Sequence, residues 1–369
     1  MLNLILGGSG TGKSRRLIDE TALQIKKGKH VFVIVPEQFS FEYDKKLYYG
    51  LGAENFNKIK SLSFTSLAKE IFEKYGGCSG EYADDISKQV IMYRTVQELK
   101  SKKAFMYFSK QAESPDFVSD ALRLVSEFRQ SGVGAQELIT KINSSDTTLR
   151  EKLLDIATLY FAYDSALRDN NLKDSLTDIT ESAVIANIND YFEGSVVMFD
   201  EFESFTGDEH EMIKTIIAQA DEVFAAFRSE NLNSEDCSIF DSVNKTCRRM
   251  LAAAQKYKIK VNTVLLDRMY RFASGDIEHL SRNILRTGKA VFENSESIKI
   301  VECTDLYGEA EYICAEIKRL VMSGLRYSDI VVTSRQLSDY VYIFESIFDR
   351  YEIPYYCLLY TSDAADDRI

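Results

Sequence analysis

Cysteine and histidine are scarce in this chain, with six and three copies among 369 residues. No two cysteines form a C-x-x-C pair, and their spacing fits no zinc framework. The three histidines are scattered and suggest no histidine-based metal site. These absences argue against a disulfide scaffold and against a structural zinc protein.

Long apolar runs and an excess of positive charge are also missing. No stretch of about 18 apolar residues is present, and the chain starts without a basic and apolar leader, so we expect a cytoplasmic protein with no membrane partner. Lysine and arginine total 45 against 57 acidic residues, a formal net charge of −12. This balance argues against a protein that binds nucleic acid through its overall charge, but it leaves room for a local basic groove.

A phosphate-binding motif is present near the N-terminus. Residues 7–14 match G-x-x-x-x-G-K-[ST] at every fixed position, between an apolar strand at 3–6 and a helix at 15–26. Backbone N–H groups of such a loop surround an anion at a helix N-terminus, the lysine reaches the β- and γ-phosphates, and the last hydroxyl binds Mg²⁺. The predicted nucleotide-binding residues are Gly7, Gly8, Ser9, Gly10, Thr11, Gly12, Lys13 and Ser14.

A second motif supplies carboxylates. Four apolar residues at 196–199 precede Asp200 and Glu201, the pattern of a Walker B strand. We expect Asp200 to hold Mg²⁺ and Glu201 to act as the general base on the attacking water. Together the two motifs predict an ATP or GTP site in which Lys13 and Glu201 are the catalytic residues.

The order of predicted elements indicates an α/β fold with a parallel sheet of P-loop NTPase type. Residues 1–75 read as three strand–helix pairs, and residues 193–290 continue the same domain. Residues 76–192 show almost only helical spacing and read as a helical insertion. Residues 291–356, with predicted strands at 298–301 and 330–333, read as the start of a second α/β domain.

Two segments resemble superfamily 1 helicases. Residues 200–206 resemble their D-E-F-Q-D-T element, and residues 61–68 resemble a motif that lines the path of single-stranded DNA. In that motif Phe64 could stack on a base and Thr65 could meet a phosphate, although a core position for Phe64 is equally compatible with the pattern. No glutamine-containing motif follows the Walker B strand. Arg271 is a weak candidate for an arginine that touches the γ-phosphate, and a solvated surface position suits it better.

Taken in order, these motifs resemble one family closely: AddB, the second subunit of the bacterial AddAB ATP-dependent helicase/deoxyribonuclease. The resemblance spans nearly the whole chain up to residue 356. Besides the two nucleotide motifs it covers 35–40 (Val-Pro-Glu-Gln-Phe-Ser), 205–206, 271–272, 279–280, 309–313, 326–330 and 351–354. The Val-Pro-Glu-Gln-Phe run is the most specific of these segments.

The resemblance implies a role in processing DNA double-strand breaks, with ATP and Mg²⁺ as cofactors. It implies an AddA-like helicase/nuclease partner, and single-stranded DNA and double-stranded ends as further partners. A nuclease domain with a [4Fe–4S] cluster is expected only in later sequence that this chain lacks. Many family members carry Asp-Gly where this chain has Asp200-Glu201. The retained glutamate permits hydrolysis, but the missing glutamine motif predicts nucleotide binding with slow or no turnover.

Residues 357–369 are similar to the in-frame translation of a common sequencing adapter, so we expect this tail to be an artefact and the chain to be an N-terminal fragment. Two alternative functions stay open at this point. One is an autonomous superfamily 1-like DNA-dependent ATPase or helicase, and the other is a non-hydrolysing ATP-binding scaffold subunit. A small nucleotide kinase fits less well, because it has no use for the insertion or for the second α/β unit.

Overall fold

The computed structural model describes residues 1–77, 80–114, 116–141, 147–229, 232, 240–284 and 290–357. The chain divides into two compact units, Met1–Phe272 and Ala273–Ile369. The sequence pattern placed the domain boundary near residue 290, whereas the first unit ends at Phe272. The tail predicted at 357–369 lies outside the described residues apart from Cys357.

A six-stranded sheet forms the centre of the first unit. All its strands run parallel, in the order β3-β2-β6-β7-β1-β8. The strands are β1 (Leu2–Gly7), β2 (His30–Ile34), β3 (Ile59–Leu62), β6 (Ser195–Phe199), β7 (Glu222–Phe227) and β8 (Val261–Leu266). The prediction of an α/β fold with a parallel sheet is confirmed, because the apolar runs of β1 and β6 are buried on both faces.

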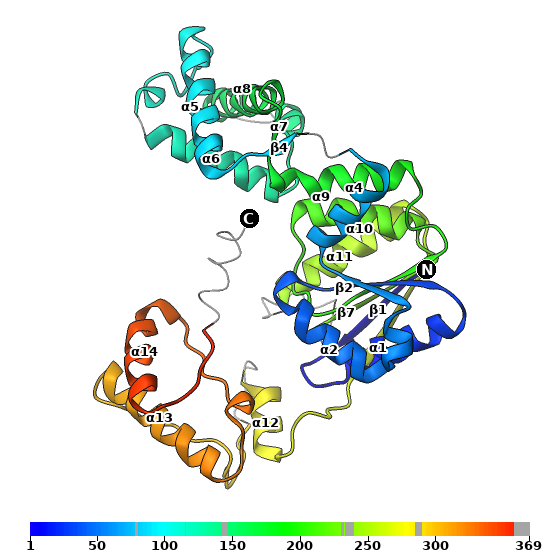
Figure 1. The fold of residues 1–369 in the computed structure, drawn as a ribbon, viewed down its shortest axis with the longest axis vertical. Helices are drawn as coiled ribbons and strands as arrows, with labels where there is room; N and C mark the ends of the chain where they lie inside the picture. The colour runs from blue at the N-terminus through cyan, green and yellow to red at the C-terminus, as the bar shows by residue number, and fades with distance from the viewer. Residues whose placement is uncertain are drawn as a thin grey trace. The chain divides into compact units, whose positions relative to one another are not determined.

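Helices cover both faces of this sheet (Figure 1). One face packs against α1 (Lys13–Lys26) and α2 (Ser40–Leu51) through side chains such as Val31 and Val33. The alternate residues, such as Phe32 and Ile34, face the opposite layer. That layer consists of α4 (Phe64–Tyr75), α9 (Asp178–Ile188), α10 (Gly207–Gln219) and α11 (Asp241–Lys256). Short helices η1 (Glu37–Phe39) and α3 (Ala53–Phe56) flank α2.

A helical insertion with its own core interrupts the α/β domain. Its ends are joined by a small parallel ladder between β4 (Glu81–Tyr82) and β5 (Leu172–Lys173). The core is built from α5 (Asp85–Ser101), α6 (Asp116–Gln130), α7 (Ala135–Lys141) and α8 (Thr147–Asp169), with turns η2 (Gln111–Glu113) and η4 (Ser175–Thr177) nearby. The predicted end at residue 192 differs from this arrangement. Ala183 and Ala186 of α9 pack in the sheet core, because the small residues on this helix let it lie close against the sheet layer.

A buried ion cluster ties α6 and α8 to the segment that leaves the insertion. The Arg129 guanidinium donates to Asp164 and to Asp174, and its side chain is 4% exposed. Lys88 of α5 lies 3.1 Å from Asp174, whose side chain is 1% exposed. The rings of Tyr160 and Tyr163 lie against the guanidinium. Burial of these charges is tolerated because every carboxylate in the cluster faces a cation.

The second unit is helical in its described part. It contains α12 (Gly275–Asn283), α13 (Leu306–Met322), η5 (Tyr327–Asp329), η6 (Leu337–Asp339) and α14 (Val341–Arg350), and α13 packs against α14. The strands predicted at 298–301 and 330–333 are not formed, so that part of the prediction is wrong for this structure. Both segments are apolar, but they have no ladder partner within the described residues, and a strand needs one to satisfy its backbone. No helix among the described residues is long and apolar enough to cross a membrane.

Candidate functional site

The glycine-rich loop joins β1 to α1 at the carboxyl edge of the sheet. Gly10 and Gly12 have φ values of 82° and 85°, a left-handed conformation that glycine adopts without strain. A side chain on Gly7 would lie 2.5 Å from the Thr11 hydroxyl, so the tight turn also requires glycine there. The Thr11 hydroxyl donates to the Gly8 carbonyl at 2.9 Å and closes the loop. The structure therefore explains the spacing of the motif by backbone geometry.

Lys13 is the first residue of α1, and its side chain folds back over the loop. Its ammonium donates to the carbonyl oxygens of Gly7 and Gly8 at 3.0 and 2.7 Å. Burial lowers the pKa of Lys13, and the negative charge of Asp200 opposes that effect. The lysine is thus a partly desolvated cation held where an anion on the loop would meet it.

Strand β6 delivers Asp200 to the same edge, where the residue is 3% exposed. Its carboxylate accepts hydrogen bonds from the Tyr43 hydroxyl at 2.7 Å and from the Ser14 side chain. Burial raises the pKa of Asp200, and these two donors act in the opposite direction. Burial and the neighbouring carboxylate in turn raise the pKa of Tyr43 well above its ordinary value. The sequence predicted Ser14 and Asp200 as Mg²⁺ ligands, and the fold brings them into direct contact.

Glu201 follows Asp200 in an unusual backbone conformation. Its φ is 63°, which is left-handed and unfavourable for a residue with a side chain. Glycine adopts this conformation without strain. The Glu201 carboxylate forms an ion pair with Lys46 of α2 at 3.0 Å.

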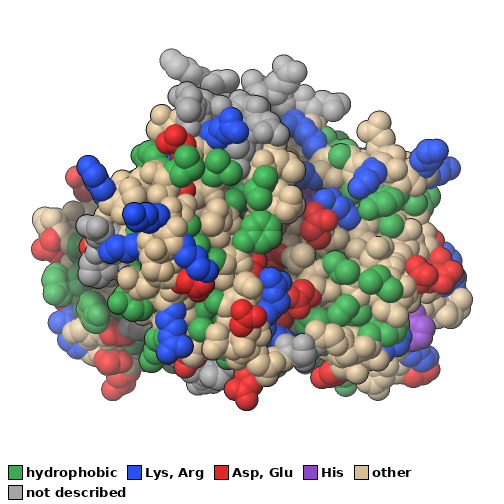
Figure 2. Space-filling view, turned by 90° about the horizontal axis from the view of Figure 1, so that it is seen from above, with side chains coloured by type: hydrophobic (Ala, Val, Ile, Leu, Met, Phe, Trp, Pro, Cys, Tyr) green, Lys and Arg blue, Asp and Glu red, His purple; other side chains and the backbone are tan. Residues whose placement is uncertain are grey.

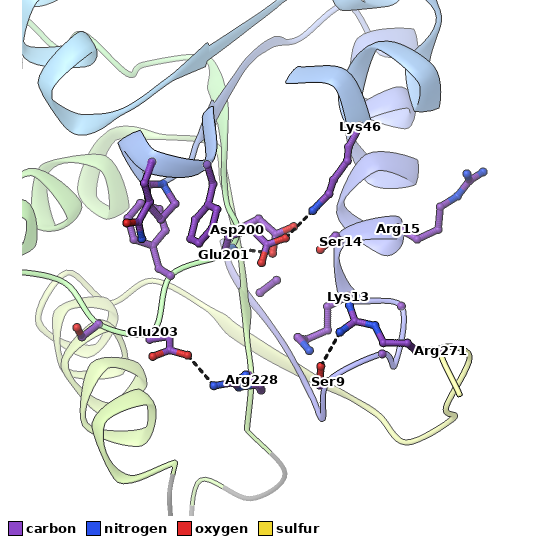
Figure 3. A pocket seen from close by; sticks show the side chains of 18 of the residues that line it. Ser9, Lys13, Ser14, Arg15, Lys46, Asp200, Glu201, Glu203, Arg228 and Arg271 are labelled. Atoms are coloured by element: carbon purple, nitrogen blue, oxygen red, sulfur yellow. Dashed lines mark hydrogen bonds and ion pairs between the residues drawn. The ribbon is translucent and has the colours of Figure 1, made fainter. Parts of the chain in front are cut away.

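A cavity of about 1060 Å³ opens between the loop and the two acids. Figure 3 shows Lys13 and Arg271 on one wall and Asp200 with Glu201 on the other. Arg228, which follows β7, also lines the cavity and pairs with Glu203 at 2.6 Å. The cavity thus holds both cations and acids. Lys13 and Arg271 are hydrogen-bonded to the loop, whereas Lys46 and Arg228 pair with acids. Such a lining suits an anionic ligand together with a divalent cation.

The segment after β8 covers the glycine-rich loop. The backbone N–H of Tyr270 donates to the Gly10 carbonyl at 2.9 Å, and the Arg271 guanidinium donates to the Ser9 hydroxyl at 3.0 Å. A side chain on Gly10 would lie 2.5 Å from the Arg271 Cβ. Arg271 is exposed, as the sequence pattern favoured, and it nevertheless contacts the glycine-rich loop and lines the cavity.

The proposed DNA-contacting pair has a different environment. Phe64 is 3% exposed and packs against Phe199, Phe202 and Phe205, so it cannot stack on a base without leaving the core. The stacking role predicted for Phe64 is therefore wrong, and its core alternative is the one observed. Thr65 donates to Glu37 at 3.2 Å and stays a candidate. The cap of α4 is Ser63, whose hydroxyl accepts a hydrogen bond from the Ser66 N–H.

Sequence reasoning missed Tyr43, Lys46 and Arg228. A usable signal existed for Arg228, because a residue directly after a parallel strand lies at the same edge as the other strand ends. Tyr43 and Lys46 are three positions apart on α2 and therefore share a helix face. Nothing in the local sequence indicates that this face meets the end of β6.

Comparison with known proteins gives a consistent result. The family model described as "ADDB, N-terminal" matches residues 4–281. Three curated relatives, each named as the B-type subunit of an ATP-dependent helicase/deoxyribonuclease, come from Clostridioides difficile (strain 630), Clostridium acetobutylicum and Acetivibrio thermocellus and are 28%, 29% and 28% identical. Each alignment covers 96% of this chain but only 32%, 31% and 32% of the relative. The chain therefore spans about a third of the length of these proteins.

Proposed function

From the premise that this chain belongs to the AddB N-terminal family, we propose that its first unit is a P-loop domain that binds ATP with Mg²⁺. One observation carries the proposal. The loop lysine Lys13, the hydroxyl of Ser14 and the acid Asp200 converge on one cavity, although Asp200 is far from the other two in the sequence. This convergence is the arrangement that phosphoryl-transfer sites require.

Each group has a defined task in this proposal. Backbone N–H groups of residues 8–12 and the N-terminus of α1 would hold the phosphates, and Lys13 would exchange its carbonyl partners for phosphate oxygens. Ser14 and Asp200 would hold Mg²⁺, which would withdraw charge from the phosphates. Arg271 adds a positive charge beside the same loop.

Hydrolysis depends on Glu201, the residue placed to accept a proton from water. Its backbone is in a left-handed conformation, and its carboxylate is engaged by Lys46 in an ion pair. We therefore propose that ATP is bound tightly and hydrolysed slowly. These restraints on Glu201 also favour the second candidate function, a scaffold subunit that binds ATP without hydrolysing it.

For the whole protein we propose the AddB role in an ATP-dependent helicase/deoxyribonuclease that processes DNA double-strand breaks. The name of the relatives supports this proposal, and the word subunit in that name supports a partner, for which an AddA-like chain is the candidate. Nuclease activity and a [4Fe–4S] cluster belong to the proposal only for sequence beyond this chain.

Single-stranded DNA is proposed as a ligand of the first unit through Thr65 and not through Phe64. The face shown in Figure 2 has Lys and Arg side chains interspersed with Asp and Glu side chains. DNA binding on such a surface would depend on local backbone contacts, since broad positive potential is missing from that face.

The decisive experiment measures binding of a fluorescent ATP analogue, with Mg²⁺, to the purified chain. We expect Lys13→Ala to weaken binding roughly 10- to 100-fold, because charged hydrogen bonds to phosphate are lost. Lys29→Ala is the matched control. Lys29 also forms an ion pair, with Asp221 at 2.6 Å, but it precedes β2 at the opposite edge of the sheet. Equal affinity of the wild-type and Lys13→Ala proteins would refute the proposed site.

A further inference from the structure

Helix α2 contacts both acids of the site from a single turn. The Tyr43 hydroxyl donates to Asp200 at 2.7 Å, and the Lys46 ammonium lies 3.0 Å from Glu201. The Lys46 ammonium also lies 5.7 Å from the centre of the Tyr43 ring. Tyr43 is 1% exposed, so this turn is anchored in the core while Lys46 reaches the cavity.

The two contacts of α2 differ in burial and therefore in how easily they are broken. The bond to Asp200 is buried and fixes the Mg²⁺-ligand candidate against the sheet. The ion pair to Glu201 is near the surface, with side chains 53% and 36% exposed, and such pairs are weak and readily opened. Figure 3 shows Lys46 extending from α2 toward the acids at the cavity mouth.

We propose that Lys46 is a positioning residue that withholds the Glu201 carboxylate from the attacking water and so keeps ATP turnover slow. This inference rests on the proposed ATP site. In the reaction, the water oxygen bonds to the γ-phosphorus, the bond from that phosphorus to the β-phosphate oxygen breaks, and a water proton passes to Glu201. The ion pair directs the Glu201 carboxylate toward α2, so the carboxylate must leave Lys46 to meet the proton of the attacking water. Opening the pair frees Glu201 for the proton.

The test compares steady-state ATP hydrolysis by the full chain and by Lys46→Met. We expect kcat to rise about two- to five-fold, the range that a surface ion pair can supply, with KM unchanged. Lys45→Met is the matched control, because Lys45 is on the same turn and pairs with Glu42 at 3.0 Å, away from the site. The control should hydrolyse ATP at the wild-type rate.

A double variant separates positioning from a general effect on folding. If Lys46 acts through Glu201, the gain must disappear when Lys46→Met is combined with Glu201→Gln. A gain that survives in the double variant overturns the proposal, and so does an unchanged kcat in Lys46→Met.

Nucleotide binding measured in parallel distinguishes the remaining outcomes. Weaker binding of the ATP analogue by Lys46→Met would make the lysine a phosphate ligand and overturn the positioning role. If the wild-type chain binds no nucleotide, the proposed function itself fails. If it binds nucleotide but the variant turnover stays flat, only the role of Lys46 fails.

Discussion

Two groups of charged side chains lie in the first unit, and they have opposite designs. In the insertion, Arg129 and Lys88 contact Asp164 and Asp174 directly, and the side chains of Arg129 and Asp174 are almost fully buried. At the sheet edge, Lys13 and Arg271 donate to atoms of the glycine-rich loop, and the pairs of Lys46 with Glu201 and of Arg228 with Glu203 are exposed. Buried pairing uses the charges for structure, whereas cations on a loop or in exposed pairs stay available to a charged ligand. The arrangement of charges, more than their number, thus distinguishes a binding site from a structural joint.

The largest expected effect concerns the buried ion cluster around Arg129. Arg129→Met should lower the free energy of unfolding by about 3–5 kcal/mol, because it leaves two carboxylates with less compensation in the interior. Chemical denaturation followed by circular dichroism measures this. Arg123→Met is the control, since its pair with Asp120 is exposed and worth less than about 1 kcal/mol. If a folded Arg129→Met protein loses affinity for ATP, the cluster around Arg129 is not purely structural, and its contrast with the sheet-edge site is wrong.

Neutralising a charge at the sheet-edge site should instead raise the free energy of unfolding. Because burial raises the pKa of Asp200 in the folded chain, its contribution to stability is present at low pH and is lost as the pH rises through that pKa. At neutral pH, Asp200→Asn should therefore raise the free energy of unfolding of the protein without nucleotide. The same variant should lose stabilisation by ATP and Mg²⁺.

Denaturation at several pH values, with and without nucleotide, measures both effects of Asp200→Asn. Asp221→Asn is the control, because Asp221 is exposed and pairs with Lys29 at the other sheet edge. A less stable Asp200→Asn protein with normal nucleotide binding would show that Asp200 belongs to a structural cluster after all.

The smallest expected effect concerns the backbone at Glu201. Glu201→Gly should raise the free energy of unfolding by about 0.5–1 kcal/mol, because glycine removes the left-handed strain but costs entropy in the unfolded chain. Glu203→Gly, at a position outside the left-handed region, should instead be destabilising. Thermal melting measures the stability of both variants. Equal shifts in their melting temperatures would contradict the claim that the backbone at Glu201 is strained.

Much of the site was predictable because its signals are local. The loop at 7–14 needs glycines at particular positions, and the acids follow an apolar run, so both motifs are legible without tertiary information. Phe64 shows where this reasoning ends. An aromatic residue at a strand end is compatible with stacking on DNA or with burial, and only the neighbouring rings decide between them.

The sequence by itself determined the parallel α/β unit, the glycine-rich loop and the acids, because strand, helix and turn preferences act over a few residues. Tertiary structure alone decided that β7 lies between β1 and β6, that α9 joins the sheet core, and that Tyr43 and Lys46 meet the acids. These features depend on pairing and packing between segments far apart in the chain. Local patterns do not specify such partners, since any buried strand or helix face offers similar apolar surface to several alternatives.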